Sequence, residues 1–314
     1  MNALDRALNS INLIIKAAEE DEDIANDMPN DMPGAESLQA FIDEYEKKLA
    51  KLLRKQMKYY FDAINKYGAD EDIVTEDILA YLEDELFVSD DFESDMASLS
   101  EEMLIAIILV LCEIIMEAID PDVLFEELSG NTATTVSAWA VQLAAFLFLT
   151  TRNGIINAVT TAIIGNLTLS AVTTAIQDLW VFGRNRAASL AQNEVLTALS
   201  ISQQESYAQS PAVTGKVWVH TDRQQGDSRA NHQKMDGVEK GVLEEFEIID
   251  SNETCMYPRE DKLSPAEKYN CNCVIFPVVD GKTLKLSKEV KEALREEYLA
   301  ERDTTHFLTK IYDK

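Results

Sequence analysis

The 314-residue chain contains little glycine and proline, with 11 and 7 residues, and only four cysteines and three histidines. The scarcity of glycine and proline argues against a β-sandwich or β-barrel, whose many tight turns require these residues. Hydrophobic residues make up 46% of the chain, which is within the globular range. This composition favours long helices, and the length allows two domains and a sizeable core.

Basic residues are scarce in the first part of the chain. Positions 1–130 carry 33 acidic and 9 basic residues, a net charge of −24, whereas positions 131–314 carry 23 and 19, a net of −4. The acidic part would repel phosphate, which argues against groove binding to nucleic acid. We interpret it as a solvated helix surface, with docking on a basic protein surface as the alternative. No signal peptide is predicted, so the cysteines are expected to begin in a reducing cytoplasm.

Charged residues are absent from positions 128–151 and, after Arg152, from positions 153–177. A bilayer span needs about 20 largely apolar residues, and the first stretch nearly qualifies. The second stretch is diluted by threonine and asparagine, and neither has the basic flanks that set membrane orientation. We therefore expect a helical hairpin that is buried in the domain or against neighbouring subunits. Membrane contact, including two or three membrane spans, is the alternative.

The periodicity of apolar residues predicts the secondary structure. Helices are expected over 1–20, 36–66, 75–88, 100–119, 184–208 and 286–298, and strands over 217–220, 245–250, 274–279 and 283–285. The predicted fold class is mainly α, with a long helical N-terminal region followed by a small α+β C-terminal module. The predicted domains are the helical region 1–208, the module 209–285, and a C-terminal helix and tail over 286–314.

Three of the four cysteines lie within positions 255–273, and one of the three histidines lies 23 residues upstream of the first. One imidazole and three thiolates are the ligands expected of structural zinc, so we predict a site formed by His232, Cys255, Cys271 and Cys273. Such a site would order a small region with few hydrophobic residues. Buried reduced thiols, or a disulfide from Cys255 to Cys271 or Cys273, are the alternatives.

Other side chains with reactive groups have simpler interpretations. Asp222, Asp227 and Asp236 can be read as acids of a hydrolytic metal site, with Arg229 as an electrophile. Acids beside Gly and Ser are more often turn and cap residues, and Asp236-Gly237 is typical of a tight turn. The remaining ones are expected to be structural: Cys112 in an apolar core run, and His220 and His306 as isolated surface or core histidines.

One ordered series of motifs resembles a known family. It comprises Arg184-Asn185-Arg186, Asn193-Glu194, Trp218, Asp227-x-Arg229-x-x-His232, Asp236-Gly237, Tyr257-Pro258, Pro265-Ala266-Glu267 and Asn270-Cys271-x-Cys273. This order resembles the head morphogenesis domain of tailed-phage minor head proteins, the Mu F-like group, over residues 184–279. In some relatives Cys-x-x-Cys replaces Arg-x-x-His, which fits a metal-binding role for the position of His232. Cys255 is not a family position, so the resemblance supplies no fourth ligand.

The resemblance implies a non-enzymatic component of the phage head that is assembled in the host cytoplasm and lies near the portal. Its expected role is in head assembly, DNA packaging or ejection. Its expected partners are the portal or the major capsid protein, with several copies per particle and no sequence-specific contact to nucleic acid. The alternatives are an ejected protein whose apolar hairpin meets a membrane, and a metal-dependent hydrolase or nuclease that uses Asp227, His232 and the cysteines.

Overall fold

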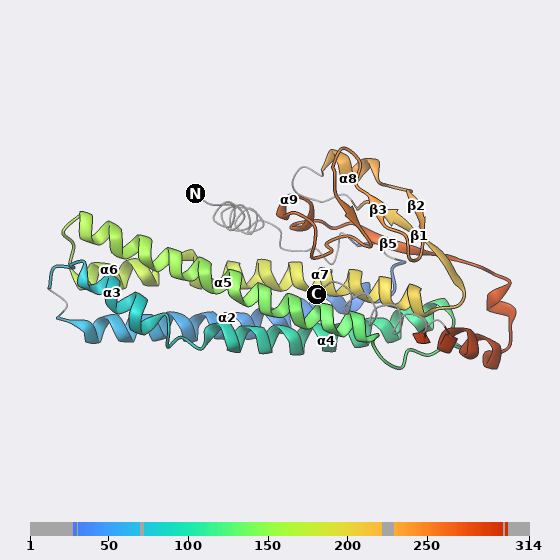
Figure 1. The fold of residues 1–314 in the computed structure, drawn as a ribbon, viewed down its shortest axis with the longest axis horizontal. Coiled ribbons are helices and arrows are strands. Elements are labelled where there is room, and N and C mark those ends of the chain that lie inside the picture. The colour runs from blue at the N-terminus through green and yellow to red at the C-terminus, as the bar shows by residue number, and fades with distance from the viewer. Residues whose placement is uncertain (1–27, 30, 70–71, 222–228, 298, 301–314) are drawn as a thin grey trace, which may run out of the picture. The chain divides into compact units, whose positions relative to one another are not determined.

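The computed structural model describes residues 28–29, 31–69, 72–221, 229–297 and 299–300 (Figure 1). Its elements are α2 (Ala35–Tyr67), α3 (Asp77–Tyr81), η3 (Leu82–Leu86), α4 (Phe92–Ile119), α5 (Gly130–Ile164), α6 (Leu169–Gln177), η4 (Trp180–Phe182), α7 (Arg184–Gln209), β1 (Val213–Val219), α8 (Ala230–Lys234), β2 (Glu239–Gly241), β3 (Phe246–Glu247), β4 (Thr254–Cys255), α9 (Pro265–Lys268), β5 (Val274–Val279) and η5 (Thr283–Lys285). A further helix covers 288–297. The mainly α fold with a small α+β module is confirmed, while the helix predicted over 1–20 lies outside the described residues.

Two local predictions need correction, and the position of the turn in the uncharged centre is now clear. The helix α5 continues through Arg152, and the chain turns only at 165–168, before α6. The strand predicted over 245–250 is reduced to the two residues of β3. The strand predicted over 283–285 is the short 3-10 turn η5, because the Asp280 carboxylate accepts hydrogen bonds from the backbone and the hydroxyl of Thr283.

The described residues form two compact units. Unit 1 contains residues 42–69, 72–101 and 138–191, and unit 2 contains residues 28–29, 31–41, 102–137, 192–221, 229–297 and 299–300. Unit 2 therefore joins α7 from residue 192 onward with the residues predicted to form the C-terminal module. The domain boundaries predicted after residues 208 and 285 stay predictions.

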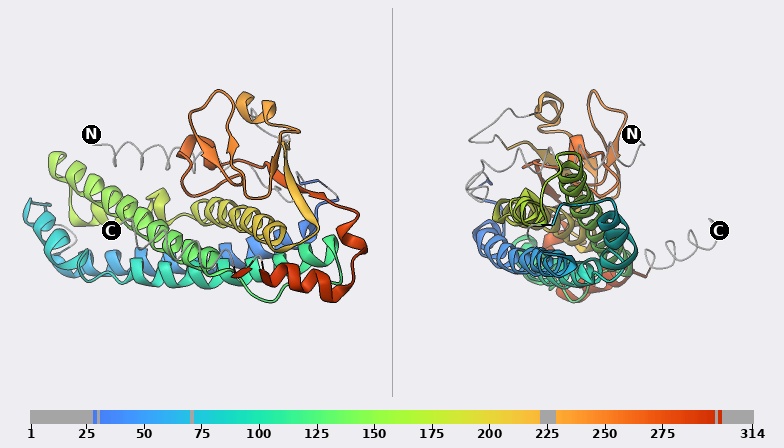
Figure 2. Two further views of the ribbon diagram at one scale, coloured as in Figure 1. Left: turned by 45° about the vertical axis from the view of Figure 1, so that its right-hand side comes forward. Right: turned by 90° about the vertical axis from the view of Figure 1, so that its left-hand side faces the viewer.

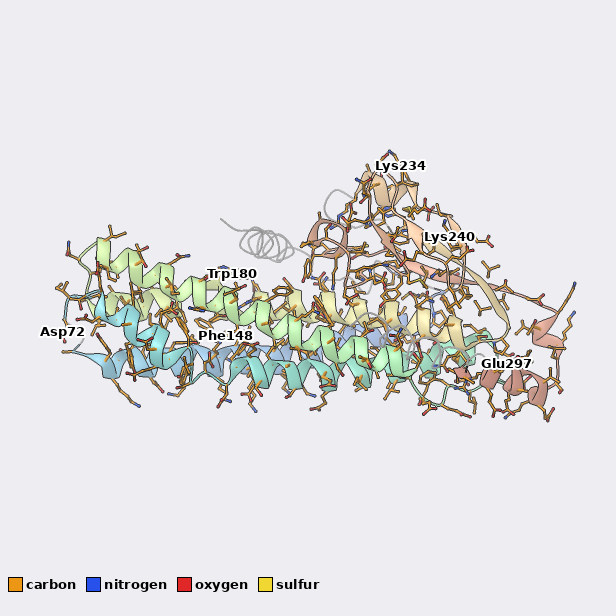
Figure 3. The ribbon with its side chains drawn as sticks, viewed as in Figure 1. Asp72, Phe148, Trp180, Lys234, Lys240 and Glu297 are labelled. Atoms are coloured by element: carbon orange, nitrogen blue, oxygen red, sulfur yellow. The ribbon has the colours of Figure 1, made fainter. Side chains whose placement is uncertain are left out.

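Unit 1 is a helical bundle with an apolar and aromatic core. The ring of Tyr60 packs on Phe87 at a centroid distance of 5.7 Å, and Phe148, which is labelled in Figure 3, meets Phe87 edge-on at 6.4 Å. Around these rings lie the buried residues Ile64, Val74, Ile78, Leu82, Leu86, Ile155, Val159, Ala162, Leu169, Val172, Ile176, Val181 and Phe182. Because these residues recur at helical spacing, their burial explains why α2, α3, α5 and α6 pack together.

One helix of the described part, α5, is long and apolar enough to cross a membrane by length and composition alone. Its most apolar window has a mean hydropathy of 1.5, and 33% of that window is buried. Val141 is 57% exposed and Ile164 is 78% exposed. The predicted burial of this segment is therefore incomplete, and the exposed residues of α5 are uncharged, including polar ones such as Gln142 and Asn157.

Unit 2 contains a three-stranded antiparallel sheet in the order β2-β1-β5. Within it, Trp218 of β1 lies opposite Ile275 of β5. A separate two-stranded sheet pairs Phe246 of β3 with Cys255 of β4. The fully buried ring of Trp218 meets Phe246 edge-on at a centroid distance of 5.3 Å, so this contact joins the two sheets.

The part of α7 in unit 2 is buried although many of its residues are polar. These are Gln192, Asn193, Glu194, Thr197, Ser200, Ser202, Gln203, Gln204, Glu205, Ser206 and Gln209. On one side the hydroxyl of Ser202 donates to the carbonyl of Ile108 in α4 at 3.4 Å. On the other side the hydroxyl of Tyr207 donates to the carbonyl of Ile275 in β5 at 2.9 Å. This helix thus lies between α4 and the sheet, and hydrogen bonds compensate for burying its polar groups (Figure 2).

Glu205 of α7 caps the N-terminus of α5, and its removal should be costly. Its carboxylate accepts hydrogen bonds from the backbone N–H of Ser129 at 2.7 Å, the hydroxyl of Thr132 at 2.6 Å and the side-chain amide of Gln209 at 2.8 Å. We expect Glu205→Ala to lower the free energy of unfolding by roughly 1–3 kcal/mol, because a buried N–H loses its acceptor. Urea unfolding should show a smaller loss for Glu205→Gln, which keeps an oxygen acceptor. Equal stability of Glu205→Ala and the wild type would contradict the capping role.

Candidate metal centre

The candidate site lies where β1, α8 and the start of β5 meet. His232 is on α8, and Cys271 and Cys273 lie between α9 and β5. Because β1 and β5 are antiparallel neighbours, with Val219 opposite Val274, the end of β1 lies beside the start of β5. The sheet therefore brings together segments that are far apart in the sequence.

His232, Cys271 and Cys273 form one group, whose possible ligand atoms all lie within 4.8 Å of one another. Nδ1 of His232 is 3.4 Å from Sγ of Cys271 and 3.7 Å from Sγ of Cys273. Each of the three residues is only 2% exposed. The structure thus brings together three of the four ligands predicted from the sequence.

The other ring nitrogen of His232 faces a carboxylate. Nε2 of His232 lies 2.7 Å from Oε2 of Glu267, on α9. The side-chain amide of Asn231 donates to both oxygens of Glu267 at 3.0 Å, which holds the carboxylate in place. If Nε2 donates its proton to Glu267, Nδ1 is the nitrogen left to bind a metal. Metal-ligating histidines in proteins almost always have such a partner on their second nitrogen.

The two cysteines of the group differ in their affinity for a proton. The hydrogen bond with Cys273 brings the pKa of Cys271 well below its ordinary value, against the effect of burial, and His232 lowers it further. The same bond and burial raise the pKa of Cys273 well above its ordinary value. Burial lowers the pKa of His232, but the hydrogen bond and the attraction to Cys271 outweigh it. The lowered pKa of Cys271 favours its thiolate, the form that binds metal.

A buried guanidinium supports the segment that carries the cysteines. Arg259, which is 1% exposed, donates to the carbonyl of Cys271. It also donates to the carbonyl of Leu196 at 3.0 Å and to the hydroxyl of Ser200 at 2.6 Å, both on α7. Burial lowers the pKa of Arg259, and the nearby charges of Cys271 and Cys273 oppose this shift. Arg259 thus ties the segment that carries Cys271 to α7.

Cys255 does not belong to the group of three. It lies on β4 opposite Phe246 and is fully buried. Burial raises the pKa of its thiol, and the neighbouring Glu260 raises it further. All four cysteines are free, so neither of the disulfides considered for Cys255 is formed. Cys112 lies in the core as predicted, and burial raises the pKa of its thiol to about 12.

His220 does not stand alone, so its description as an isolated histidine was wrong. Its Nδ1 lies 3.4 Å from Sγ of Cys273. Its backbone N–H donates to the carboxylate of Asp236 at 2.9 Å, and the hydroxyl of the next residue, Thr221, donates to the carbonyl of Asn272 at 2.8 Å. These two bonds hold the segment after β1 beside the cysteines.

The residues considered for a hydrolytic site have structural contacts instead. Asp236 accepts the backbone hydrogen bond from His220, and the next residue, Gly237, has a φ of 78°, as the predicted tight turn requires. The guanidinium of Arg229 donates to the backbone carbonyl of Tyr269. Asp222 and Asp227, the other acids considered, lie outside the described residues, as does His306, which was predicted to be an isolated histidine.

Comparisons with known proteins place the same segment in a family. Residues 153–276 match the family described as Phage Mu protein F like protein, and this range includes His232, Cys271 and Cys273. The uncharacterized protein YqbB of Bacillus subtilis strain 168 is 40% identical over 302 residues, which are 96% of this chain and 99% of that protein. No solved structure matches the chain.

Proposed function

Because the chain belongs to the phage Mu protein F-like family, a family of bacteriophage head morphogenesis, we propose that it is a minor capsid protein of a tailed-phage head. In this proposal it is assembled in the host cytoplasm and acts near the portal, in head assembly, DNA packaging or ejection. The observation that carries the proposal is the family match over residues 153–276, which includes the whole His232–Cys271–Cys273 group.

The proposal includes a Zn²⁺ ion held by His232, Cys271 and Cys273. Bond lengths of about 2.0 Å to nitrogen and about 2.3 Å to sulfur put these two ligand atoms about 3.6 Å apart in a zinc tetrahedron. The distances from His232 to the two sulfurs, 3.4 Å and 3.7 Å, lie on either side of this value. Glu267 would hold the imidazole in the ligating tautomer.

A structural role suits this centre better than a catalytic one. Catalytic zinc keeps an open position for water or substrate, whereas the three ligands here are each 2% exposed. The module meets α7 through hydrogen bonds, such as those of Tyr207 and Arg259, as well as through apolar packing. A metal ion would add the free energy of ordering that a small module lacks. In this proposal the metal is structural and the protein is not an enzyme.

The contact surface that we propose is the exposed face of α5 in unit 1, packed against portal or major capsid subunits in several copies. Val141 and Ile164 are exposed on this helix, and its only charged residue is Arg152. The exposed residues of α5 are uncharged, and such a surface on a chain with a net charge of −28 suits a contact in an assembly, because interface cores contain few charged residues. A membrane met during ejection is the alternative occupant.

Replacing Val141 with Asp tests this surface in phage particles. We expect Val141→Asp to reduce the copies of the protein in purified heads about tenfold or more, because an unpaired carboxylate would be buried at the contact. The free chain should keep its thermal midpoint, since Val141 is 57% exposed. Quantitative mass spectrometry of purified heads gives the copy number.

Val88→Asp is the matched control, because Val88 is 77% exposed, also lies in unit 1 and is not part of α5. This variant should enter heads at the wild-type level. Equal incorporation of both variants would show that the α5 face is not the contact. Absence of the wild-type chain from purified heads would refute the proposed role in the head itself.

A further inference from the structure

We propose that His220 is the fourth ligand of the zinc ion, so that two imidazoles and two thiolates complete the centre. The inference rests on the proposed zinc site and concerns the side chain that closes it. Structural zinc is almost always four-coordinate, and His232, Cys271 and Cys273 supply three ligands. The sequence pattern nominated Cys255 as the fourth, whereas the structure assigns this place to His220.

The distance from His220 to Cys273 supports the assignment. Nδ1 of His220 lies 3.4 Å from Sγ of Cys273, the same separation as between Nδ1 of His232 and Sγ of Cys271. Both values match the separation of about 3.6 Å expected for nitrogen and sulfur on one tetrahedral zinc ion. His220 lies outside the mutual 4.8 Å group, so its ring must turn toward Cys271 and His232. His220 is of intermediate burial, so it is less enclosed than the three other ligands.

Hydrogen bonds hold the backbone around His220 beside the other proposed ligands. Its N–H is bonded to Asp236, which follows the helix that carries His232. The adjacent Thr221 is bonded to the carbonyl of Asn272, which lies between the two ligand cysteines. The segment after β1 is therefore tied to both segments that supply the other ligands.

The other candidates fit less well. Cys255 is fully buried on β4 opposite Phe246, and its thiol lies outside the group of ligand atoms that are within 4.8 Å of one another. Both oxygens of Glu267 already accept hydrogen bonds from Asn231, and one also faces His232. Asp222 and Asp227 lie outside the described residues.

Titration of the purified full-length chain with Co²⁺ tests the assignment, because Co²⁺ reports tetrahedral geometry and the number of thiolate ligands in its absorption spectrum. We expect the wild type to bind one Co²⁺ with the charge-transfer intensity of two thiolates. His220→Ala should lose the tetrahedral ligand-field bands and bind Co²⁺ at least about tenfold more weakly, the lower limit seen for lesser disturbances of metal sites. Cys255→Ser should retain the wild-type spectrum.

His220→Cys gives a second, positive readout, since it should raise the charge-transfer intensity from two thiolates to three. The inference is overturned if Cys255→Ser lowers the thiolate intensity, or if His220→Ala leaves the spectrum unchanged. An unchanged spectrum in both of these variants would point to an acid of the segment 222–228. Failure of the wild type to bind either Co²⁺ or Zn²⁺ would instead refute the zinc site itself.

Discussion

Cys271→Ser is expected to abolish zinc binding and to lower the free energy of unfolding by several kcal/mol. Structural zinc contributes about 10–16 kcal/mol of apparent binding free energy in zinc-finger peptides, and that free energy is coupled to folding. The loss should be smaller here, because Arg259 and Tyr207 keep hydrogen bonds between the module and α7. Elemental analysis for zinc and urea unfolding measure the two effects. Wild-type protein stripped by a chelator should behave like the variant.

Cys112→Ser is the matched control for this experiment. Cys112 is a buried thiol of α4 whose Sγ lies 3.7 Å from the carbonyl of Ser202, and it has no place in the proposed centre. This variant should retain one zinc ion per chain and lose only about 1 kcal/mol, as a typical point substitution does. The proposal fails if chelation leaves the unfolding midpoint unchanged and the two serine variants are equally stable.

The second large effect is expected at Arg259. Replacing it with Met keeps much of the side-chain volume but removes every hydrogen bond to Leu196, Ser200 and Cys271. Three buried acceptors would lose their donor, and each such loss costs roughly 1–3 kcal/mol. We expect Arg259→Met to lower the free energy of unfolding by roughly 3–5 kcal/mol, allowing for non-additivity. Urea unfolding at constant zinc concentration measures this change.

Two further variants test whether the lower stability of Arg259→Met comes from the lost hydrogen bonds of the guanidinium. Arg259→Lys should recover only part of the stability, because an ammonium group cannot reproduce the planar fork of a guanidinium. Arg184→Met, which removes an 80% exposed side chain bonded to Glu46 at 2.7 Å, should cost about 1 kcal/mol or less. If the Arg259 and Arg184 variants lose the same amount, Arg259 does not hold the ligand segment to α7.

Local patterns in the sequence were enough to predict most of the described helices and the three residues of the His/Cys group. Apolar residues at helical spacing identified α2, because burial of one helix face depends on a period of 3.6 residues, and a long apolar run identified most of α4. His232, Cys271 and Cys273 stood out because soft ligands are rare in this chain and cluster near its end. The order of the surrounding motifs led to the correct family.

The same reasoning could not identify the neighbours of the centre. His220 and Cys273 are 53 positions apart in the sequence, and they meet only because β1 pairs with β5. No local pattern encodes that pairing. Glu267 was part of the motif series, but nothing in the sequence linked it to His232. Arg259 follows Tyr257-Pro258 and gave no sign that it would be buried, since arginine is usually exposed.

Composition, periodicity and the rarity of Cys and His, all properties of the sequence by itself, determined that this protein is mainly helical with a small C-terminal module. Only the tertiary structure decided that Cys255 lies apart from His232, Cys271 and Cys273, and that His220 contacts Cys273. It also decided that the polar residues of α7 are buried. The physical reason is that helix formation depends on residues a few positions apart. A metal centre and a buried hydrogen-bonded helix depend on strands and loops that meet across long stretches of chain.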